Sequence, residues 1–596
     1  MRGFARGTIA YAAQCWRLDR RRALISFALM LLQSASMPLA AAALAALTDA
    51  VVEGDARGAT LAAALVAAAV ITSLTAGHIA HIFYFELSEA MTLSLNRELI
   101  DLSNGSPGIE HHERPEYADK LQVLRTEISR IGFQALQAVL TGFGLTLAIG
   151  ITAALLARLD PWLLLLPLAA IPPLLLSRYA ETMVAGARER AAESHRRARH
   201  LFGLSVDPGP AKELRVGNLG QAIRDRHRVA WDATSRTLLG TENRALAVRL
   251  SGQLFFAVAY VAATLLVVRN TVAGHGTVGD VILVLTLAAQ VSGQVTTAVT
   301  ILQTMQRTAQ AMINLEWVRR LVTAAPEHGV PADALTPDRI VDGITFDRVS
   351  FTYPGTERPV LGDVSLHLPA GSTVAIVGEN GAGKTTLVKL LARFYETTTG
   401  VISVDGVDLR RIPLSAWRER IAAGFQDFAR LEFLARQTVG VGDLPQIDSD
   451  ASVIGALERA KAESLLERLE DGLDTQLGLS ADGTELSGGQ WQKLALGRAM
   501  MRPTPLLLVL DEPTSALDAQ AEHQLFEQYS MNARRVGEQN GAITVLVSHR
   551  FSTVRMADLI LVVDGGRITE AGTHGELMRT GGLYAELYSM QAAAYS

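Results

Sequence analysis

The segment STVAIVGENGAGKTTLVKLLARF, from Ser372 to Phe394, indicates the fold class of the second half of this 596-residue chain. An apolar run typical of a β-strand leads into a glycine-rich loop, and the loop leads into a run typical of a helix. The loop matches GxxxxGK[ST] in the strand–loop–helix context that this phosphate-binding motif requires. The predicted nucleotide-binding residues are Gly378, Glu379, Asn380, Gly381, Ala382, Gly383, Lys384, Thr385 and Thr386.

The chemistry of this loop follows from its residue types. Glycines let backbone N–H groups surround phosphates, and the N-terminus of the following helix adds partial positive charge. Lys384 is suited to neutralise the β- and γ-phosphates, and the hydroxyl of Thr385 is a candidate ligand for Mg²⁺. The stretch therefore predicts a nucleotide site in an α/β domain.

A second apolar run, LLLVLDE from Leu506 to Glu512, ends in two carboxylates about 130 residues after the loop. A buried strand that carries acids at its carboxyl end suits the crevice of an α/β sheet. We expect Asp511 to hold Mg²⁺ through water and Glu512 to polarise the attacking water. Together the loop and the carboxylates predict nucleotide hydrolysis.

On the N-terminal side of the loop, the α/β pattern begins near residue 341. An alternation of apolar residues from Ile344 to Tyr353 predicts a strand. Before it, the polar and proline-rich stretch AAPEHGVPADALTPD predicts a linker over 324–340. We therefore expect an α/β nucleotide-binding domain over 341–596 and a different domain over 1–323.

The first domain is predicted to be solvated by lipid. The chain is 49% hydrophobic and only 19% charged, its mean hydropathy is +0.21, and soluble domains are about 25% charged. Long runs lack Asp, Glu, Lys and Arg, and a bilayer core needs about 20 residues. The predicted spans cover about 23–47, 59–85, 132–157, 161–178, 250–268 and 281–306.

The distribution of Lys and Arg predicts the orientation of these spans. Placing both termini in the cytoplasm leaves 25 Lys and Arg in the inner arm and connections and only Arg57, Arg158 and Arg269 in the outer ones. A cleavable signal peptide is the alternative for the first run, but its apolar core would be too long. We therefore expect a multi-pass protein of the bacterial inner membrane, with the nucleotide-binding domain cytoplasmic.

The inner connections are long and charged, which predicts that their helices extend into the cytoplasm. Each has a tip rich in helix breakers, at Pro107–Tyr117 and Asp207–Gly217. No Cys or further His accompanies the neighbouring His111 and His112, so a solvated or interfacial histidine pair is favoured over a metal site. The single cysteine, Cys15, excludes an intramolecular disulfide framework, and a net charge of −5 excludes a globally basic nucleic-acid binder.

A further motif, Leu486-Ser487-Gly488-Gly489-Gln490, resembles the LSGGQ signature of ATP-binding cassette (ABC) proteins. The order of the motifs is also similar, and six spans before one cassette resemble an ABC half-exporter. The resemblance implies an ATPase with ATP and Mg²⁺ as cofactors, which works as a homodimer or with a second half-transporter. The signature of one cassette would then contact nucleotide on the other.

The resemblance also implies roles for single residues. Tyr353 would stack on adenine, Asp518 would bridge the two cassettes, and His549 would hold the γ-phosphate. Gln426 would sense Mg²⁺ and the γ-phosphate. The implied catalytic residues are Glu512, His549 and Gln426. The implied metal-binding residues are Thr385, Gln426 and Asp511. The two tips would be coupling helices that seat on cassettes, on their own or on the partner's.

A closer resemblance, to bacterial exporters of lantibiotic peptides, rests on Phe425–Asp443 and Leu486–Ala499. The sequence departs from that pattern at Leu431, Leu434, Ala435 and Thr438. Because the chain shows no peptidase domain before its first span, any leader cleavage would need another protein. The expected function is ATP-driven export of a peptide or amphipathic small molecule by alternating access.

Other functions share this architecture or its parts. Lipid flipping, drug efflux and siderophore transport use the same arrangement, and an ATP-gated membrane regulator or channel is the alternative from another class. The intact Glu512 argues against the last of these. Polar residues in the spans, among them His78, His81, Gln290 and Gln303, either bond between helices or line a cavity.

Overall fold

The computed structural model describes residues 2–323, 333, 335–479, 482–512, 531, 534–548 and 554–594. The chain forms two compact units. The first contains Met1–Asn104 and Ala118–Arg320, and the second contains Gly105–Tyr117 and Leu321–Ser596. The tip of the first inner connection therefore groups with the C-terminal part of the chain, although about 200 residues separate them in the sequence.

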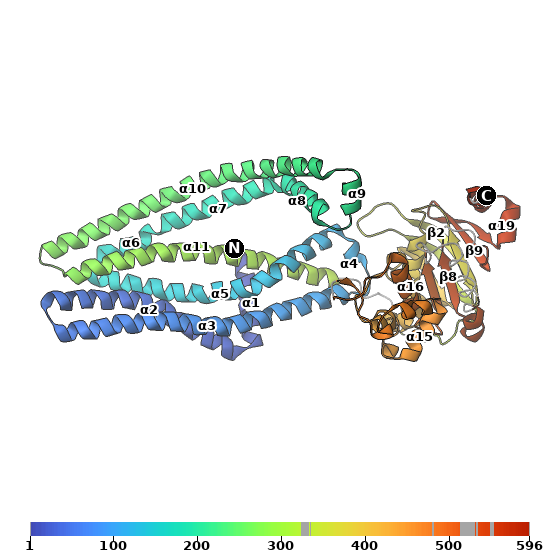
Figure 1. The fold of residues 1–596 in the computed structure, drawn as a ribbon, viewed down its shortest axis with the longest axis horizontal. Coiled ribbons are helices and arrows are strands. Elements are labelled where there is room, and N and C mark those ends of the chain that lie inside the picture. The colour runs from blue at the N-terminus through green and yellow to red at the C-terminus, as the bar shows by residue number, and fades with distance from the viewer. Residues whose placement is uncertain are drawn as a thin grey trace. The chain divides into compact units, whose positions relative to one another are not determined.

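The first unit is a bundle of long helices. Within the described residues, six helical stretches are long and apolar enough to cross a membrane, which confirms the predicted number. They are α2 (Arg20–Glu53), α3 (Ala56–Asn104), α5 (Pro115–Leu159), the segmented stretch Pro161–Arg190, α10 (Gly220–Val272) and α11 (Val278–Thr323). The helix α2 lies beside α3, and α10 runs along α7 (Ile171–Arg190) and α8 (Ala192–Val206) (Figure 1).

Local sequence explains where these helices begin and end. Asp19 accepts hydrogen bonds from two backbone N–H groups at the start of α2, and Gly54 ends that helix in the left-handed conformation. The fourth span is broken into a 3-10 turn (Pro161–Leu164), α6 (Leu165–Ala169) and α7. The prolines in this span lack the backbone donors that a continuous helix needs. The sequence pattern predicts no helix before the first span, whereas α1 occupies Arg2–Leu18.

Both predicted tips contain short helices. These are α4 (Glu110–Glu113) in the first connection and α9 (Ala211–Val216) in the second. The first tip contacts the C-terminal part of its own chain.

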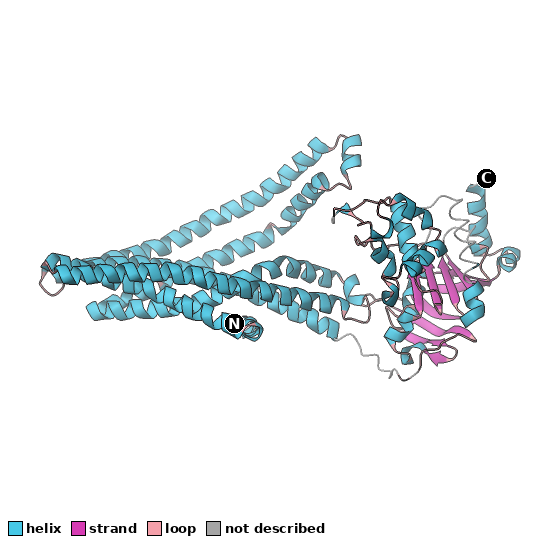
Figure 2. Ribbon diagram, turned by 60° about the horizontal axis from the view of Figure 1, so that its bottom comes forward, coloured by secondary structure: helices cyan, strands magenta, loops and turns pink. Residues whose placement is uncertain are grey.

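The second unit contains two sheets with helices around them (Figure 2). One sheet has the order β2-β1-β4-β5 and pairs antiparallel, and the other has the order β10-β9-β3-β8-β7-β6. The strands are β1 (Gly343–Phe351), β2 (Leu361–Pro369), β3 (Thr373–Val377), β4 (Thr399–Val404), β5 (Val407–Asp408), β6 (Ile421–Gly424), β7 (Leu507–Asp511), β8 (Ile543–Val547), β9 (Leu559–Asp564) and β10 (Arg567–Gly572).

The second sheet carries the predicted site. Its strands β3, β7 and β8 are buried along their whole length, which explains their continuous apolar sequences. Helix α12 (Lys384–Leu391) follows β3, and α16 (Gly488–Ala499) precedes β7. Other helices of the unit are α13 (Leu414–Glu419), α14 (Ala435–Gly440), α15 (Asp450–Arg459), α19 (His574–Thr580) and α20 (Leu583–Ala594).

Candidate functional site

The predicted phosphate loop connects β3 to α12, as the sequence pattern requires. Gly378 has a φ of +150° and Gly383 a φ of +110°, in the region that favours glycine. A Cβ atom on Gly378 would lie 2.1 Å from the carbonyl oxygen of Val563. These two glycines therefore let the loop turn closely over the sheet.

Lys384 is folded back onto this loop. Its Nζ donates hydrogen bonds to the carbonyl oxygens of Gly378 and Glu379, each at 2.8 Å, and the residue is only 7% exposed. Burial lowers the pKa of Lys384, while the carboxylates of Glu512 and Asp511 act in the opposite direction. The structure thus holds a cation inside the loop that wraps the predicted phosphates.

Strand register brings the other parts of the site to the same edge of the sheet. In parallel pairing, Ile376 lies opposite Val547, Val547 opposite Asp511, and Leu510 opposite Gly424. The carboxyl ends of β3, β8, β7 and β6 consequently coincide. This edge is where an α/β sheet binds ligands.

Three predicted site residues follow these strand ends. Gly378 comes after β3, Glu512 directly after β7, and Gln426 two residues after β6. The side chain of Gln426 is exposed. His549, which would follow β8, and Asp518 lie outside the described residues.

Asp511 is buried beside the loop and is 5% exposed. Burial, followed by the neighbouring charge of Glu512, raises the pKa of Asp511 to about 6, whereas a hydrogen bond with the side chain of Thr385 lowers it. A desolvated carboxylate beside a hydroxyl and a second carboxylate is a set of hard oxygen donors, which suits Mg²⁺. Two of the three residues of the predicted metal set, Thr385 and Asp511, therefore fit Mg²⁺ in their chemistry and proximity.

Glu512 has an unusual backbone conformation for a glutamate. Its φ is +48°, and its backbone N–H donates to the carbonyl oxygen of Val547 at 2.9 Å. Non-glycine residues in this region cost about 1–3 kcal/mol and concentrate at functional sites. This conformation is held by the hydrogen bond between the ends of β7 and β8.

Tyr353 lies beside the helix that follows the loop. Its hydroxyl is hydrogen-bonded to Oγ1 of Thr386 at 3.1 Å, and Nζ of Lys389 lies 5.3 Å from the centre of its ring. The ring also packs edge-on against Tyr395, at 5.3 Å between centres. These contacts place a half-buried aromatic ring next to the phosphate loop.

The signature residues begin α16. Ser487 caps this helix: its hydroxyl accepts from the backbone N–H of Gln490 at 3.3 Å, and Oε1 of Gln490 accepts from the N–H of Ser487 at 2.7 Å. Leu486 is buried, whereas Ser487 and Gly488 are exposed. The first N–H groups of a helix have no acceptor within it, so those of Gly488 and Gly489 are available to an anion.

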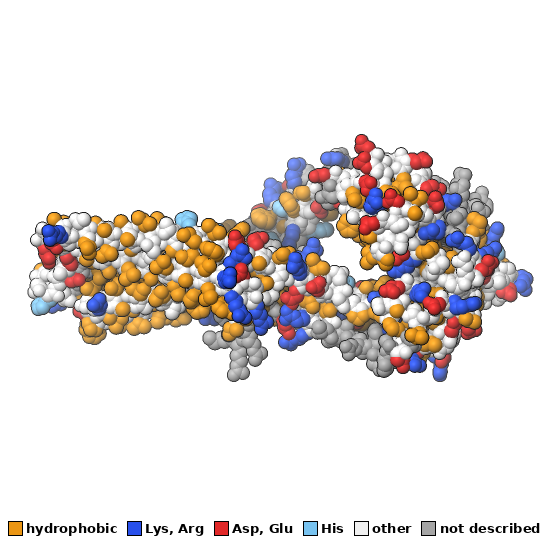
Figure 3. Space-filling view, turned by 90° about the horizontal axis from the view of Figure 1, so that it is seen from below, with side chains coloured by type: hydrophobic (Ala, Val, Ile, Leu, Met, Phe, Trp, Pro, Cys, Tyr) orange, Lys and Arg blue, Asp and Glu red, His pale blue; other side chains and the backbone are white. Residues whose placement is uncertain are grey.

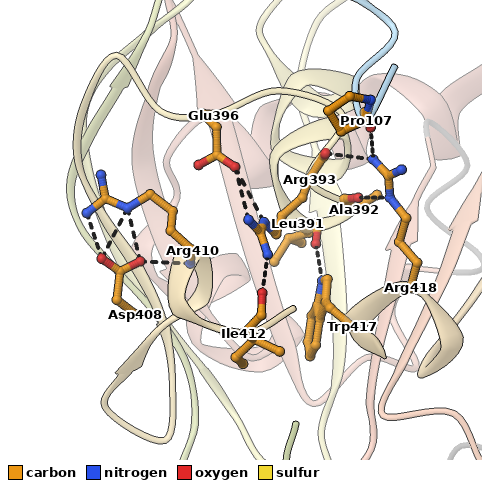
Figure 4. Close-up of polar contacts among 10 residues, drawn as sticks. All are labelled: Pro107, Leu391, Ala392, Arg393, Glu396, Asp408, Arg410, Ile412, Trp417 and Arg418. Atoms are coloured by element: carbon orange, nitrogen blue, oxygen red, sulfur yellow. Dashed lines mark hydrogen bonds and ion pairs between the residues drawn. The ribbon is translucent and has the colours of Figure 1, made fainter. Parts of the chain in front are cut away.

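The backbone of the first inner tip contacts the rest of the second unit. The guanidinium of Arg418 donates to the carbonyl oxygen of Pro107 at 2.6 Å and to that of Arg393 at 2.7 Å (Figure 4). A Cβ atom on Gly108 would lie 2.8 Å from the carbonyl oxygen of Phe394. The close approach of the two backbones explains the glycine.

Buried polar contacts support this seat. Arg393 is 4% exposed and donates to the carbonyl oxygen of Ile412 at 2.6 Å, and the indole N–H of Trp417 donates to that of Leu391 at 2.9 Å (Figure 4). These bonds satisfy groups that would be costly to bury alone. They fix the segments that carry Arg418.

An acidic side chain links the tip to the aromatic cluster. Glu113 forms an ion pair with Lys389 at 2.6 Å and accepts a hydrogen bond from the hydroxyl of Tyr395. Burial lowers the pKa of Lys389, but the hydrogen bond with Glu113, the charge of Glu113 and the interactions with Tyr353 together outweigh this effect, and the pKa is raised. These residues could not be predicted, because nothing in the sequence pattern around Glu113 indicates a partner 276 positions away.

Some polar residues of the spans form hydrogen bonds to helices, and at least one lines a cavity. The side-chain N–H of Gln290 donates to the carbonyl oxygen of Met37 at 3.1 Å, which joins α11 to α2. Nδ1 of His78 lies 2.7 Å from a carbonyl of its own helix, and Nδ1 of His81 lies 2.7 Å from the hydroxyl of Tyr84. Gln303 lines a cavity between α7 and α11.

Comparison with known proteins identifies relatives of both halves of the chain. A model of the ABC transporter family matches residues 361–515. Over 491 residues the chain is 30% identical to the subtilin transport ATP-binding protein SpaT of Bacillus subtilis, a match that covers 80% of this chain and 76% of that protein.

Other relatives match over a shorter length or by structure. The chain is 42% identical over 248 residues to the ATP-dependent lipid A-core flippase of Albidiferax ferrireducens, and this match covers 42% of the chain and 41% of the flippase. The chain thus spans less than half the length of that flippase. A solved structure of a bacterial Atm1-family ABC exporter with ATP bound superposes with a TM-score of 0.72 and 25% identity, covering 96% of this chain and 98% of the other.

Proposed function

We propose, from the premise that this chain belongs to the ABC transporter family, that it is an ATP-hydrolysing exporter of a peptide or amphipathic small molecule. The observation that carries the proposal is the meeting of Lys384, Asp511 and Glu512 at one sheet edge, in a chain that also contains six candidate spans. The relatives named as lipid A-core flippases support lipid flipping as the second candidate.

In this proposal each described residue of the site has a role toward ATP. The loop from Gly378 to Gly383 donates backbone N–H groups to the phosphates, Lys384 neutralises their charge, and Tyr353 stacks on adenine. Glu512 accepts a proton from the attacking water. Thr385, Gln426 and Asp511 would hold Mg²⁺, which when bound would supply positive charge toward the β- and γ-phosphates.

The proposal assigns 1–323 to a transmembrane domain and 341–596 to a cytoplasmic cassette. The backbone N–H groups of Gly488 and Gly489, at the start of α16, would contact ATP on a second cassette, so two chains would share two sites. Closure of the cassettes around ATP would be transmitted through the tips to the bundle, and hydrolysis would reset it. Because Glu512 is present, turnover is favoured over an ATP-gated channel.

The purified chain alone, reconstituted in nanodiscs with Mg²⁺, is expected to hydrolyse ATP. Nucleotide hydrolysis would be followed by phosphate release, and export by ATP-dependent accumulation of peptide, lipid and drug probes in inside-out vesicles. Hydrolysis by the isolated chain supports a homodimer. Hydrolysis that appears only after a second half-transporter is added supports a heterodimer, and none under either condition contradicts the function.

The Glu113→Gln substitution is expected to raise the KM for ATP about threefold, a size typical of a partly exposed ion pair. The variant loses the charge that holds Lys389 and Tyr395 against the ring of Tyr353. Steady-state hydrolysis at varied ATP concentration measures the effect. Glu110→Gln is the matched control, because Glu110 pairs with Arg114 of the same tip, and equal KM values for the two variants would contradict the link to Tyr353.

A further inference from the structure

A cavity of about 460 Å³ lies between α7 and α11 in the first unit. Its wall on α7 includes Leu174, Arg178 and Arg188. The two arginines lie 4 and 14 positions after Leu174, so the three residues share one face of the helix. Its wall on α11 includes Gln303 and Arg307, four positions apart. This volume is in the range of small-molecule sites, about 300–1,000 Å³.

The sequence places this cavity at the cytoplasmic edge of the bilayer. The uncharged run 161–176 ends just before Arg178, and the uncharged run 281–306 ends just before Arg307. Two separate spans therefore change from apolar to cationic at the same cavity, at the level where lipid head groups begin. In the first unit, Lys and Arg side chains gather where the hydrophobic surface of the spans ends (Figure 3).

The cavity carries an excess of positive charge. Arg178, Arg188 and Arg307 form no ion pair within the part of the chain that the structure describes. The acid in the wall, Glu181, contacts Arg249 of α10 at 2.8 Å. Since Glu181 is the one acid among the described residues of the wall, against three arginines, the wall keeps an excess of positive charge.

Apolar side chains complete the wall on the membrane side of these charges. Leu174 precedes Arg178 on α7. Val299 and Leu302 precede Arg307 on α11. Guanidinium groups bind phosphate and carboxylate through paired hydrogen bonds, and the amide of Gln303 adds a neutral donor. The cavity therefore combines an anion-binding end with an apolar end.

We propose that this cavity binds the anionic head group of an amphiphile drawn from the cytoplasmic leaflet, with its chain along the apolar end. The proposal rests on the proposed export function and names its substrate class: amphiphiles that carry phosphate or carboxylate, rather than cationic peptides or drugs. Arg178 and Arg307, which come from different helices, clamp the head group from opposite walls. Arg188 contributes further positive charge on the cytoplasmic side.

Binding of a fluorescent short-chain phosphatidic acid to the full chain in nanodiscs of zwitterionic lipid, without nucleotide, tests the site. Arg178→Gln and Arg307→Gln are each expected to weaken the Kd about tenfold, as for loss of a hydrogen bond to a charged group. Arg190→Gln is the matched control, because it removes the same charge from α7 outside the cavity wall. Its Kd is expected to equal that of the unmodified chain, and equal losses in all three variants would overturn the site.

Ligands of other charge test the chemistry on the unmodified protein, so the result does not depend on whether the variants fold. A fluorescent cationic amphiphile with the same chain is expected to bind at least tenfold more weakly, and equal binding would overturn the assignment. Inorganic phosphate at millimolar concentration is expected not to displace the probe. Displacement by phosphate would assign the cavity to a free anion instead.

ATP hydrolysis, measured on the same samples, separates this inference from the proposed function. Hydrolysis without binding of the anionic probe overturns the cavity assignment and leaves the ATPase intact. Binding without hydrolysis contradicts the proposed function while supporting the site.

Discussion

The Glu512→Gln substitution is expected to lower steady-state ATP hydrolysis at least a hundredfold while ATP still binds. A positioned general base contributes about 10²–10⁴-fold to a rate, and an amide cannot accept the proton of the attacking water. The shape of the side chain is kept, and the backbone at φ +48° is the same for both residues. ATP should therefore remain bound, held by Lys384 and the glycine loop.

The measurement pairs phosphate release with retention of radiolabelled ATP on the reconstituted protein. Asp427→Asn is the matched control, because Asp427 is an exposed carboxylate whose charge also raises the pKa of Asp511. This control is expected to keep turnover within about threefold of the unmodified chain. Turnover above about a tenth of normal in Glu512→Gln would rule out Glu512 as the general base.

The Lys384→Ala substitution is expected to weaken ATP binding about a hundredfold. Lys384 is the buried cation of the loop, and its Nζ lies among the carbonyl oxygens of Gly378 and Glu379. Truncation removes charge-assisted bonds to phosphate, worth about 1.5–3 kcal/mol each. It also leaves two loop carbonyls without their donor.

Equilibrium titration with a fluorescent ATP analogue measures this loss, and thermal unfolding of the same sample checks that the cassette is folded. Lys389→Ala is the control on the same helix. Because Lys389 contacts Glu113 and the ring of Tyr353 rather than the loop, its effect is expected to be only about threefold. An ATP affinity in Lys384→Ala equal to that of the control would contradict the phosphate role.

Features with a local physical cause could be predicted from the sequence. The phosphate loop was recognised because its glycines, its preceding strand and its following helix are adjacent in the chain, and Gly378 and Gly383 adopt the positive φ values that glycine favours. The six spans were recognised because lipid excludes charge over about 20 residues. The break at Ala170 is signalled only by the prolines of this span, because the lipid-facing composition is otherwise the same in a segmented helix and a continuous one.

The candidate site was predictable only in part. Lys384, Asp511 and Glu512 belong to recognisable motifs, and the resemblance to ABC proteins supplied roles for Tyr353 and Gln426. The contact of Glu113 with Lys389, the seat of Pro107 on Arg418 and the raised pKa of Asp511 carry no signal in the sequence. Each depends on burial and on neighbours far away in the chain.

The amino-acid sequence is enough to predict the two-part architecture, the nucleotide motifs and the number of spans, because backbone conformation and transfer into lipid act on neighbouring residues. Only the tertiary structure decided which motifs meet: parallel register aligned the ends of β3, β8, β7 and β6, and the first tip seated on its own chain. It also placed Arg178 and Arg307 around one cavity. Such contacts arise from packing among distant segments, which no local pattern encodes.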